Sequence, residues 1–196
     1  MALFYRFARL VCRLVLLLLR RWKVEGAENL PPTGGVLVVS NHASYWDPVV
    51  VGCALGRQVH FMAKADLFKI PLLGAVIRAL GAFPVQRGSG DRQAIRRALE
   101  LLEEGKVVGI FPEGTRSKTG TLLDPHRGAA MLALRAKVPV LPMALLNTPG
   151  VFGRVRVRVG KPLYFAGNGE AFGRRDYQAV SREIMQEIKR LMDKER

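Results

Sequence analysis

Cysteine is scarce in this chain, which has only two in 196 residues. Cys12 and Cys53 lie in apolar surroundings, and no CxxC, HExxH or histidine-rich cluster appears anywhere in the sequence. The absence of these spacings argues against a zinc site. We therefore expect a reduced chain that faces the cytosol and needs no metal and no other cofactor.

Acidic residues are also few, because 16 Asp and Glu stand against 31 Lys and Arg, which gives a net charge of +15. Such an excess favours anionic partners, among them nucleic acid, anionic lipid and an acidic carrier protein. No nucleic-acid-binding motif is present and the aromatic residues do not alternate with a basic stripe, so we do not expect nucleic acid as a partner. Hydrophobic residues make up 49% of the chain, which excludes a disordered protein.

A long apolar run is missing as well. Residues 2–19 are rich in Leu, Val and Phe, but their longest charge-free stretch, 14–19, is far shorter than the roughly 20 residues that a spanning helix needs. Four arginines fall within an arc of about 60° on a helical wheel: Arg6, Arg9, Arg13 and Arg20. The pattern predicts an amphipathic helix over residues 1–23 that lies in an anionic membrane interface on the cytoplasmic face. The alternative is a helix that packs its apolar face on the core and turns its arginines to water.

Beyond this segment, short apolar runs alternate with periodic segments of helical length. The predicted strands cover Val36–Ser40, Gln58–Ala63, Ala82–Gln86, Val107–Phe111, Val138–Leu145 and Val155–Val159, and the predicted helices cover residues 3–22, 48–56, 70–80, 91–104, 127–136 and 176–194. This alternation predicts one α/β domain over residues 24–196, with a mostly parallel central sheet and helices on both faces. In the last strand arginines alternate with valines, so we expect that strand near an edge, with a basic face toward water or a membrane.

The first of these strands ends in polar residues of chemical interest. The chain turns polar at Asn41 and His42, and a helix is expected to begin at Asp47 and Pro48, since Asp favours the N-cap and Pro the first helical position. A turn between His42 and Asp47 would let the two side chains meet, and a histidine held by a carboxylate is typical of a general base. On its own the pair has a simpler interpretation, in which a capping aspartate happens to lie beside a histidine in a turn.

Two further strands deliver polar segments to the same region. Residues 83–86 lead to Arg87, and residues 107–110 lead to Phe111–Ser117. Because the carboxyl ends of parallel strands lie along one edge of a sheet, where α/β proteins bind ligands, we expect these segments to converge with His42. This expectation assumes that the three strands are parallel neighbours.

The residue types at this edge suit a phosphate-bearing ligand. Arg87 and Arg116 offer planar, permanently charged groups that match phosphate oxygens. Gly114 and Thr115 belong to a tight turn that would expose backbone N–H groups to a ligand. Glu113 has the wrong charge for an anion site, so its expected role is to hold an arginine or a backbone N–H in place.

Taken in order, four segments of the chain resemble the motifs of a known enzyme family. They are Asn41-His42 with Asp47, Phe83-Pro84-Val85-Gln86-Arg87, Phe111-Pro112-Glu113-Gly114-Thr115-Arg116-Ser117 and Val138-Pro139-Val140-Leu141-Pro142. This set is similar to the four motifs of the glycerolipid acyltransferases, most closely the bacterial 1-acyl-glycerol-3-phosphate acyltransferases. The resemblance extends from about residue 24 to residue 162 and includes the spacing between the motifs.

The resemblance implies a role for each matching residue. His42 is the general base that takes the proton of an acceptor hydroxyl, and Asp47 holds it. The acceptor phosphate is bound by the matching polar residues, which are Arg87, Glu113, Gly114, Thr115 and Arg116, with Arg127 as a further candidate. The fourth motif either shapes a wall beside the acyl chain or is an ordinary buried strand. Residues 67–80 line an acyl groove, rest on a membrane or pack in the core.

By the same resemblance, the reaction moves a fatty acyl group from acyl-CoA or acyl carrier protein to the free hydroxyl of a lysophospholipid, 1-acyl-glycerol-3-phosphate. The product is phosphatidic acid. Glycerol-3-phosphate or another lyso-lipid is an alternative acceptor, because the four motifs do not decide the headgroup. A non-catalytic lipid-binding protein of the same fold is a further alternative, although His42 and Asp47 are both present.

Overall fold

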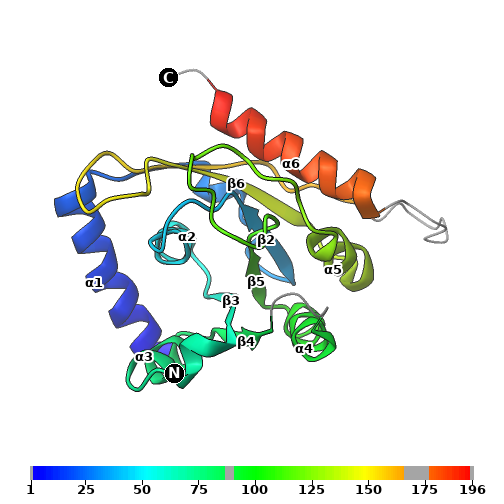
Figure 1. Ribbon diagram of the computed structural model, residues 1–196, viewed down its shortest axis with the longest axis horizontal. Coiled ribbons are helices and arrows are strands. Elements are labelled where there is room, and N and C mark those ends of the chain that lie inside the picture. Colours follow the sequence, from blue (N-terminus) through cyan, green and yellow to red (C-terminus); the bar gives the residue numbers. More distant parts are fainter. Residues whose placement is uncertain (1, 87–90, 166–176, 195–196) are drawn as a thin grey trace.

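The computed structural model describes residues 2–86, 91–165 and 177–194 and has an α/β fold built on one sheet (Figure 1). The strands lie in the order β1-β7-β6-β2-β5-β3-β4. Strands β2 to β6 are parallel, and β7 and β1 run the other way because β7 pairs antiparallel with β6. The strands are β1 (Lys23–Glu25), β2 (Val36–Ser40), β3 (Val59–Lys64), β4 (Phe83–Val85), β5 (Val107–Ile110), β6 (Val140–Leu146) and β7 (Arg156–Val159). The helices are α1 (Ala2–Arg20), α2 (Asp47–Ala54), α3 (Leu73–Ala79), α4 (Arg92–Glu103), α5 (Gly128–Ala136) and α6 (Tyr177–Asp193).

Strand β2 occupies the middle of the sheet and is buried along its whole length. Val36 and Val38 face the layer of α1 and α2, whereas Leu37 and Val39 face the layer of α4, α5 and α6 (Figure 1). Successive side chains of a strand point to opposite faces, so an uninterrupted apolar run is what a strand covered on both sides requires. The central position of β2 places the residues that follow it at the middle of the carboxyl edge of the sheet, the usual ligand site of such folds.

The expected α/β architecture is confirmed, and each predicted strand and helix has a counterpart with slightly different ends. Strand β1 is an addition that the sequence pattern does not predict, because three residues carry too little periodicity. The helix expected over residues 70–80 begins only at Leu73, after a 3-10 turn at Ala65–Lys69.

The last strand, β7, lies next to the edge strand β1 as expected, but one arginine of its basic face, Arg158, does not point to water. Helix α6 covers that face, and Arg158 is only 6% exposed. Its Nη1 donates hydrogen bonds to the carbonyl oxygens of Leu191 (2.8 Å) and Met192 (3.2 Å) at the end of α6. The last carbonyls of a helix lack partners within the helix and carry the negative end of its dipole, so an arginine is stabilised there. The expectation of a solvent-facing or membrane-facing arginine at this position is therefore wrong.

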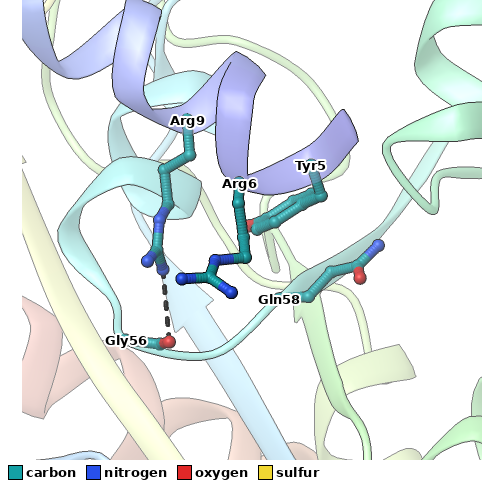
Figure 2. Close-up of a pocket in the computed structure, with 5 residues that line it drawn as sticks. All are labelled: Tyr5, Arg6, Arg9, Gly56 and Gln58. Carbon is teal, nitrogen blue, oxygen red and sulfur yellow. Dashed lines mark hydrogen bonds between the residues drawn. The ribbon is translucent and has the colours of Figure 1, made fainter. Parts of the chain in front are cut away.

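Helix α1 lies against α2 with most of its arginines turned toward the protein. Arg9 Nη1 donates to the carbonyl oxygens of Leu55 (3.0 Å) and Gly56 (3.2 Å), and Figure 2 shows it reaching down to Gly56. Arg13 Nε donates to the carbonyl of Cys53 at 2.9 Å. These two arginines of α1 therefore hold the carbonyls at the end of α2, as a cation at a helix C-terminus should.

The opposite face of α1 is apolar and exposed. Its large exposed side chains are Leu3, Phe4, Phe7, Leu10, Val11, Leu14, Leu17, Leu18 and Leu19. The alternative in which this face packs on the core while the arginines face water is therefore wrong. Among the residues that the structure describes, no helix has the length and apolar character to cross a bilayer.

Two other open alternatives are decided by burial. Within residues 67–80 only Gly74 is buried, and Leu72 is 80% exposed, so packing in the core is wrong for this segment. In the fourth motif, Val140 and Leu141 are 0% exposed and belong to β6 between β2 and β7. The interpretation as an ordinary buried strand is confirmed, because these side chains face the core rather than an open wall.

Candidate active site

His42 and Asp47 meet at the carboxyl end of β2. Nδ1 of His42 lies 2.7 Å from Oδ2 of Asp47, and the two side chains are 10% and 0% exposed. Because an ionised carboxylate can only accept, the neutral imidazole carries its proton on Nδ1 and leaves a lone pair on Nε2. Nε2 has no hydrogen-bond partner among the described residues. The pair therefore presents a basic nitrogen at the edge of the sheet, in the arrangement expected of a general base.

The turn between the two residues is built around the carboxylate of Asp47. Its Oδ2 also accepts hydrogen bonds from the N–H groups of Ala43 and Ser44, each at 2.7 Å. These donors stabilise a charge that would otherwise be costly to bury. Contrary to the expectation, Asp47 is the first residue of α2 rather than its N-cap, and its side chain makes no capping bond. The carboxylate bends back over the turn instead, which brings together two residues five apart in sequence.

Glu113 links the loop after β5 to the loop after β2. It is 2% exposed, its Oε1 accepts from the N–H of His42 (2.8 Å), and its Oε2 accepts from the N–H of Leu123 (3.0 Å). Burial raises the pKa of this carboxyl above its ordinary value, and the two hydrogen bonds lower it in part. The N–H of Ser117 also donates to the carbonyl of His42 at 2.7 Å, so the two loops are joined twice. Both oxygens of Glu113 are thus occupied by the backbone.

Gly114 makes the turn of the third motif possible. Its φ of 65° is in the left-handed region, and a Cβ at this position would lie 2.6 Å from Cδ2 of His126. Its N–H donates to the carbonyl of Phe111 at 3.0 Å and is not available to a ligand. Within the described part of the chain, the N–H groups of Thr115 and Arg116 have no hydrogen-bond partner, so both are available to a ligand.

Arg116 lies across Tyr45, a residue that the sequence did not single out. Its Cζ is 3.5 Å from the centroid of the tyrosine ring, and its Nη2 donates to the Tyr45 hydroxyl at 2.9 Å. Tyr45 belongs to the turn between His42 and Asp47 and is 78% exposed. Stacking of this kind is worth about 0.5–1 kcal/mol at an exposed site. The tyrosine therefore holds the guanidinium near the turn between His42 and Asp47, and the other N–H groups of Arg116 stay available to an anion.

The structure gives a position to some of the remaining predicted phosphate ligands but not to all of them. Thr115 is exposed beside Arg116. Arg127 is exposed at the start of α5, and the preceding residue His126 donates its N–H to the carbonyl of Pro112 at 2.9 Å, which brings this helix to the third motif. Arg87 lies outside the described residues.

The strands that carry these segments are parallel, but they are not all neighbours. Strands β2 and β5 pair directly, whereas β3 separates β5 from β4, which leads to Arg87. The expectation of three adjacent strands is therefore correct for the first and third motifs and wrong for the second.

Two further residues position the imidazole. The ring of Phe111 stacks on that of His42 with centroids 4.0 Å apart and an interplanar angle of 15°. The side chain of Asn41 forms two hydrogen bonds with the backbone of Leu145, from Nδ2 to the carbonyl (2.9 Å) and from the N–H to Oδ1 (2.8 Å). Asn41 thus extends the pairing of β2 with β6 and fixes the point where His42 leaves the sheet. The motif contains Asn41, but nothing in the sequence indicates this contact.

The hollow drawn in Figure 2 is separate from this site. It lies beneath α1 and is lined by Tyr5, Arg6, Arg9, Gly56 and Gln58. Gly56 and Gln58 precede β3, whereas His42 and Glu113 follow β2 and β5. Because these strands are parallel, the hollow and the candidate site lie at opposite edges of the sheet.

Known proteins match this chain over most of its length. The family model described as Acyltransferase matches residues 21–146. A 1-acyl-sn-glycerol-3-phosphate acyltransferase of Bacillus subtilis is 32% identical, over 97% of this chain and 98% of that protein. The chloroplastic 1-acyl-sn-glycerol-3-phosphate acyltransferase BAT2 of Brassica napus is 36% identical over 72% of this chain, which spans only 44% of that longer protein.

A solved structure has the same fold. The crystal structure of the 1-acyl-sn-glycerophosphate acyltransferase PlsC from Thermotoga maritima superposes with a TM-score of 0.75 at 25% identity, and the match covers 98% of this chain and 80% of that one. Since the family model covers more than half of the chain and the Bacillus subtilis protein matches nearly all of it, the chain belongs to the Acyltransferase family.

Proposed function

We propose that this protein transfers a fatty acyl group from a thioester donor to the free hydroxyl of 1-acyl-glycerol-3-phosphate, which gives phosphatidic acid. The observation that carries the proposal is the 2.7 Å contact between His42 Nδ1 and Asp47, with Nε2 left unpartnered in the described structure. The substrate follows from relatives, since the Bacillus subtilis and Brassica napus proteins are both called 1-acyl-sn-glycerol-3-phosphate acyltransferases.

In this reaction Nε2 of His42 removes the proton of the acceptor hydroxyl while the oxygen attacks the thioester carbonyl. An alcohol is too weak an acid to ionise near neutral pH, and general-base assistance of this kind contributes roughly 10²–10⁴-fold. The tetrahedral intermediate then expels the donor thiolate, which takes the proton from the imidazolium. Asp47 keeps the proton on Nδ1 and stabilises the imidazolium as it forms.

The acceptor phosphate binds beside this base at the turn of the third motif. Arg116 supplies a guanidinium held on Tyr45, and the N–H groups of Thr115 and Arg116 are free to donate. Arg127, exposed at the start of α5, adds positive charge. Arg87 is assigned to the phosphate only from its match to the second motif. Glu113 and Gly114 act indirectly, because their polar groups are used to hold the backbone of the two loops.

The donor is acyl-CoA or acyl carrier protein, and both are anionic. A net charge of +15 attracts either one. The two are distinguished by supplying each acyl thioester separately with the same lysophosphatidic acid.

The protein works at the cytoplasmic face of a membrane, where its lipid acceptor resides. Helix α1 supports this placement, since its apolar face is exposed while Arg9, Arg13 and Arg20 are bound within the protein. An exposed apolar face of this length is expected to enter the interface between lipid headgroups and acyl chains. Attachment is therefore peripheral or monotopic.

The catalytic roles are tested by assaying phosphatidic acid formation from an acyl thioester and lysophosphatidic acid in detergent. His42→Ala should reduce kcat at least a hundredfold. Asp47→Asn should also reduce kcat severely, because an amide that donates to Nδ1 favours the tautomer with the proton on Nε2, where the free lone pair is needed. Asp193→Asn is the matched control for the aspartate change, since Asp193 is an exposed carboxylate on α6. Folding is checked by circular dichroism. Full turnover by a folded His42→Ala protein would defeat the proposed mechanism.

A further inference from the structure

The loop between β6 and β7 carries exposed apolar side chains at its tip. Val151 is 54% exposed and Phe152 is 76% exposed. Single apolar residues on a surface need no explanation, but an aromatic ring that extends a larger apolar surface marks a contact site. The exposed face of α1 is a larger apolar surface, and Figure 1 shows the backbone of this loop, in yellow, reaching over to the end of that helix.

Arg20 fastens the loop to α1. This last residue of the helix is 1% exposed, and its guanidinium donates to four successive carbonyl oxygens. Nη1 contacts Gly150 at 2.6 Å, and Nη2 contacts Asn147 at 2.7 Å, Thr148 at 3.0 Å and Pro149 at 3.3 Å. A buried arginine that satisfies four carbonyls holds the loop and the helix as one unit.

Further contacts satisfy more of the backbone of the loop without water. The carbonyl of Arg154 accepts from Asn147 Nδ2 at 3.3 Å, and the carbonyl of Val155 accepts from the N–H of Lys23 at 2.9 Å. In water such groups would find solvent partners at no cost. In lipid an unpaired carbonyl is expensive, so a loop that enters a membrane needs its partners built in.

Cationic side chains flank the apolar tip. Arg21 and Arg154 are exposed on either side of the backbone pairing between Arg20 and Val155, and neither has an ion-pair partner among the residues described. An apolar tip bordered by unpaired cations fits an anionic lipid surface, because the cations can reach headgroup phosphates while the ring enters the interface.

We propose that residues 147–154 form a second lipid contact, inserting Phe152 into the membrane interface beside α1. This inference rests on the membrane placement in the proposed function and specifies its geometry. The loop begins two residues after Leu145, which pairs with Asn41 next to His42. Insertion of the loop therefore brings the carboxyl edge of the sheet, and with it the general base, against the surface that holds the acceptor.

Tryptophan quenching by lipid tests the insertion directly. Phe152→Trp is mixed with vesicles of phosphatidylcholine and phosphatidylglycerol that carry brominated acyl chains, and the signal of Trp22 and Trp46 is subtracted with the wild-type protein. Tyr164→Trp is the matched control, because Tyr164 is equally exposed (72%) but lies at the other end of β6, next to the bridge from Leu163 to Val140. We expect strong quenching at position 152 and none at position 164.

Binding measured by vesicle sedimentation gives a second readout. Phe152→Ser should weaken the affinity roughly tenfold through the lost transfer of an aromatic ring, while Tyr164→Ser should bind like the wild type. Thermal unfolding of each variant shows that its fold is intact. If the wild-type protein binds vesicles normally but the tryptophan at position 152 is not quenched, the proposed lipid contact of the loop is overturned and the membrane placement is not. Failure of the wild-type protein to bind vesicles overturns both the loop contact and the membrane placement beneath it, whereas the catalytic assay in detergent is independent of either.

Discussion

At the scale of single residues, the candidate site depends on side chains that act through other groups. Asp47 fixes the turn from His42 to Ser44 as well as the imidazole, and Glu113 fixes the backbone at His42 from the neighbouring loop. Tyr45 holds Arg116. The proposed reactive nitrogen and the proposed phosphate donors therefore occupy positions set by polar contacts, in keeping with the demand of catalysis for groups oriented before the substrate arrives.

The contact between Tyr45 and Arg116 predicts a graded effect on acceptor binding. Tyr45→Phe removes the 2.9 Å hydrogen bond and keeps the stacked ring, whereas Tyr45→Ala removes both. We expect the KM for lysophosphatidic acid to rise about threefold in the first variant and about tenfold in the second, from roughly 0.7 kcal/mol for each contact. The KM for the donor should stay the same, as steady-state kinetics with each substrate varied will determine. Tyr164→Phe controls for loss of an exposed hydroxyl, and parallel changes in both KM values would contradict phosphate positioning.

The raised pKa of Glu113 predicts a pH-dependent contribution to stability. Burial raises the pKa of this carboxyl above the ordinary value of 4.5. At pH values between the ordinary pKa and the folded pKa, the native state therefore keeps a proton that the unfolded chain has already lost. The contribution of the protonated carboxyl to the free energy of unfolding is therefore full at pH values below the ordinary pKa, and it is lost as pH rises through the folded pKa. Glu113→Gln has no such proton, so its stability deficit relative to the wild type should narrow as pH rises from about 4 to about 8 in urea unfolding. A deficit that widens with pH would mean that the folded pKa is lowered instead.

The same variant should lose activity. An amide offers one acceptor oxygen to the two N–H groups of His42 and Leu123, and a buried donor left without a partner costs about 1–3 kcal/mol. We expect kcat to fall about tenfold or more through displacement of the His42 backbone. Glu103→Gln on the exposed side of α4 is the matched control and should leave both stability and kcat unchanged.

At the scale of elements, α1 and α2 form a coupled pair. Helix α2 carries Asp47 at its start and is held at its end by Arg9 and Arg13 of α1. Arg13→Met keeps most of the apolar stem and removes the donor to Cys53, so we expect a loss of about 1–2 kcal/mol in the free energy of unfolding. Arg6→Met is the matched control on the same helix, since Arg6 is exposed with no hydrogen bond among the described residues, and it should change stability by less than about 0.5 kcal/mol. Equal losses of unfolding free energy in the two variants would show that the positive charge of α1, and not the contact of Arg13 with α2, stabilises the protein.

Periodicity in the sequence was sufficient to predict the elements and their layers, because a buried parallel sheet has a simple pattern. It failed where burial depends on partners far along the chain. The alternation of Arg158 with valines predicts an exposed face, yet α6 supplies carbonyls that the arginine caps. The wheel of α1 predicts two faces correctly but not which one meets the protein, because the decisive acceptors are the carbonyls that close α2.

The contact of His42 with Asp47 could be predicted because the residues are close in sequence and the turn is short. Contacts between loops could not. Tyr45 with Arg116 and His42 with Glu113 each span 71 positions, and their approach follows only from the adjacency of β2 and β5. Such adjacency is a property of sheet topology, which local pattern leaves open.

At the scale of the whole molecule, binding to a membrane should separate into an apolar part and an electrostatic part. The apolar part belongs to α1 and the loop beside it. The arginines of α1 at positions 9, 13 and 20 donate hydrogen bonds to carbonyls of the protein. The electrostatic part comes from the excess of Lys and Arg over Asp and Glu in the rest of the chain, which contributes most of the net charge of +15. Salt screens the second and not the first, since the Debye length falls from about 10 Å at 0.1 M to about 3 Å at 1 M.

We therefore expect the wild-type protein to bind neutral phosphatidylcholine vesicles with an affinity that salt does not weaken. Adding phosphatidylglycerol should strengthen binding at low salt, and this gain should disappear at about 1 M salt. Replacing Leu14 and Leu18 together by serine should weaken binding to neutral vesicles at least tenfold, because both side chains are exposed on the apolar face of α1 and each would lose its transfer into lipid. The same variant should keep the salt-sensitive gain on anionic vesicles, since no charge has changed. If high salt instead releases the wild-type protein from both kinds of vesicle, attachment is electrostatic and the exposed face of α1 must serve some other contact.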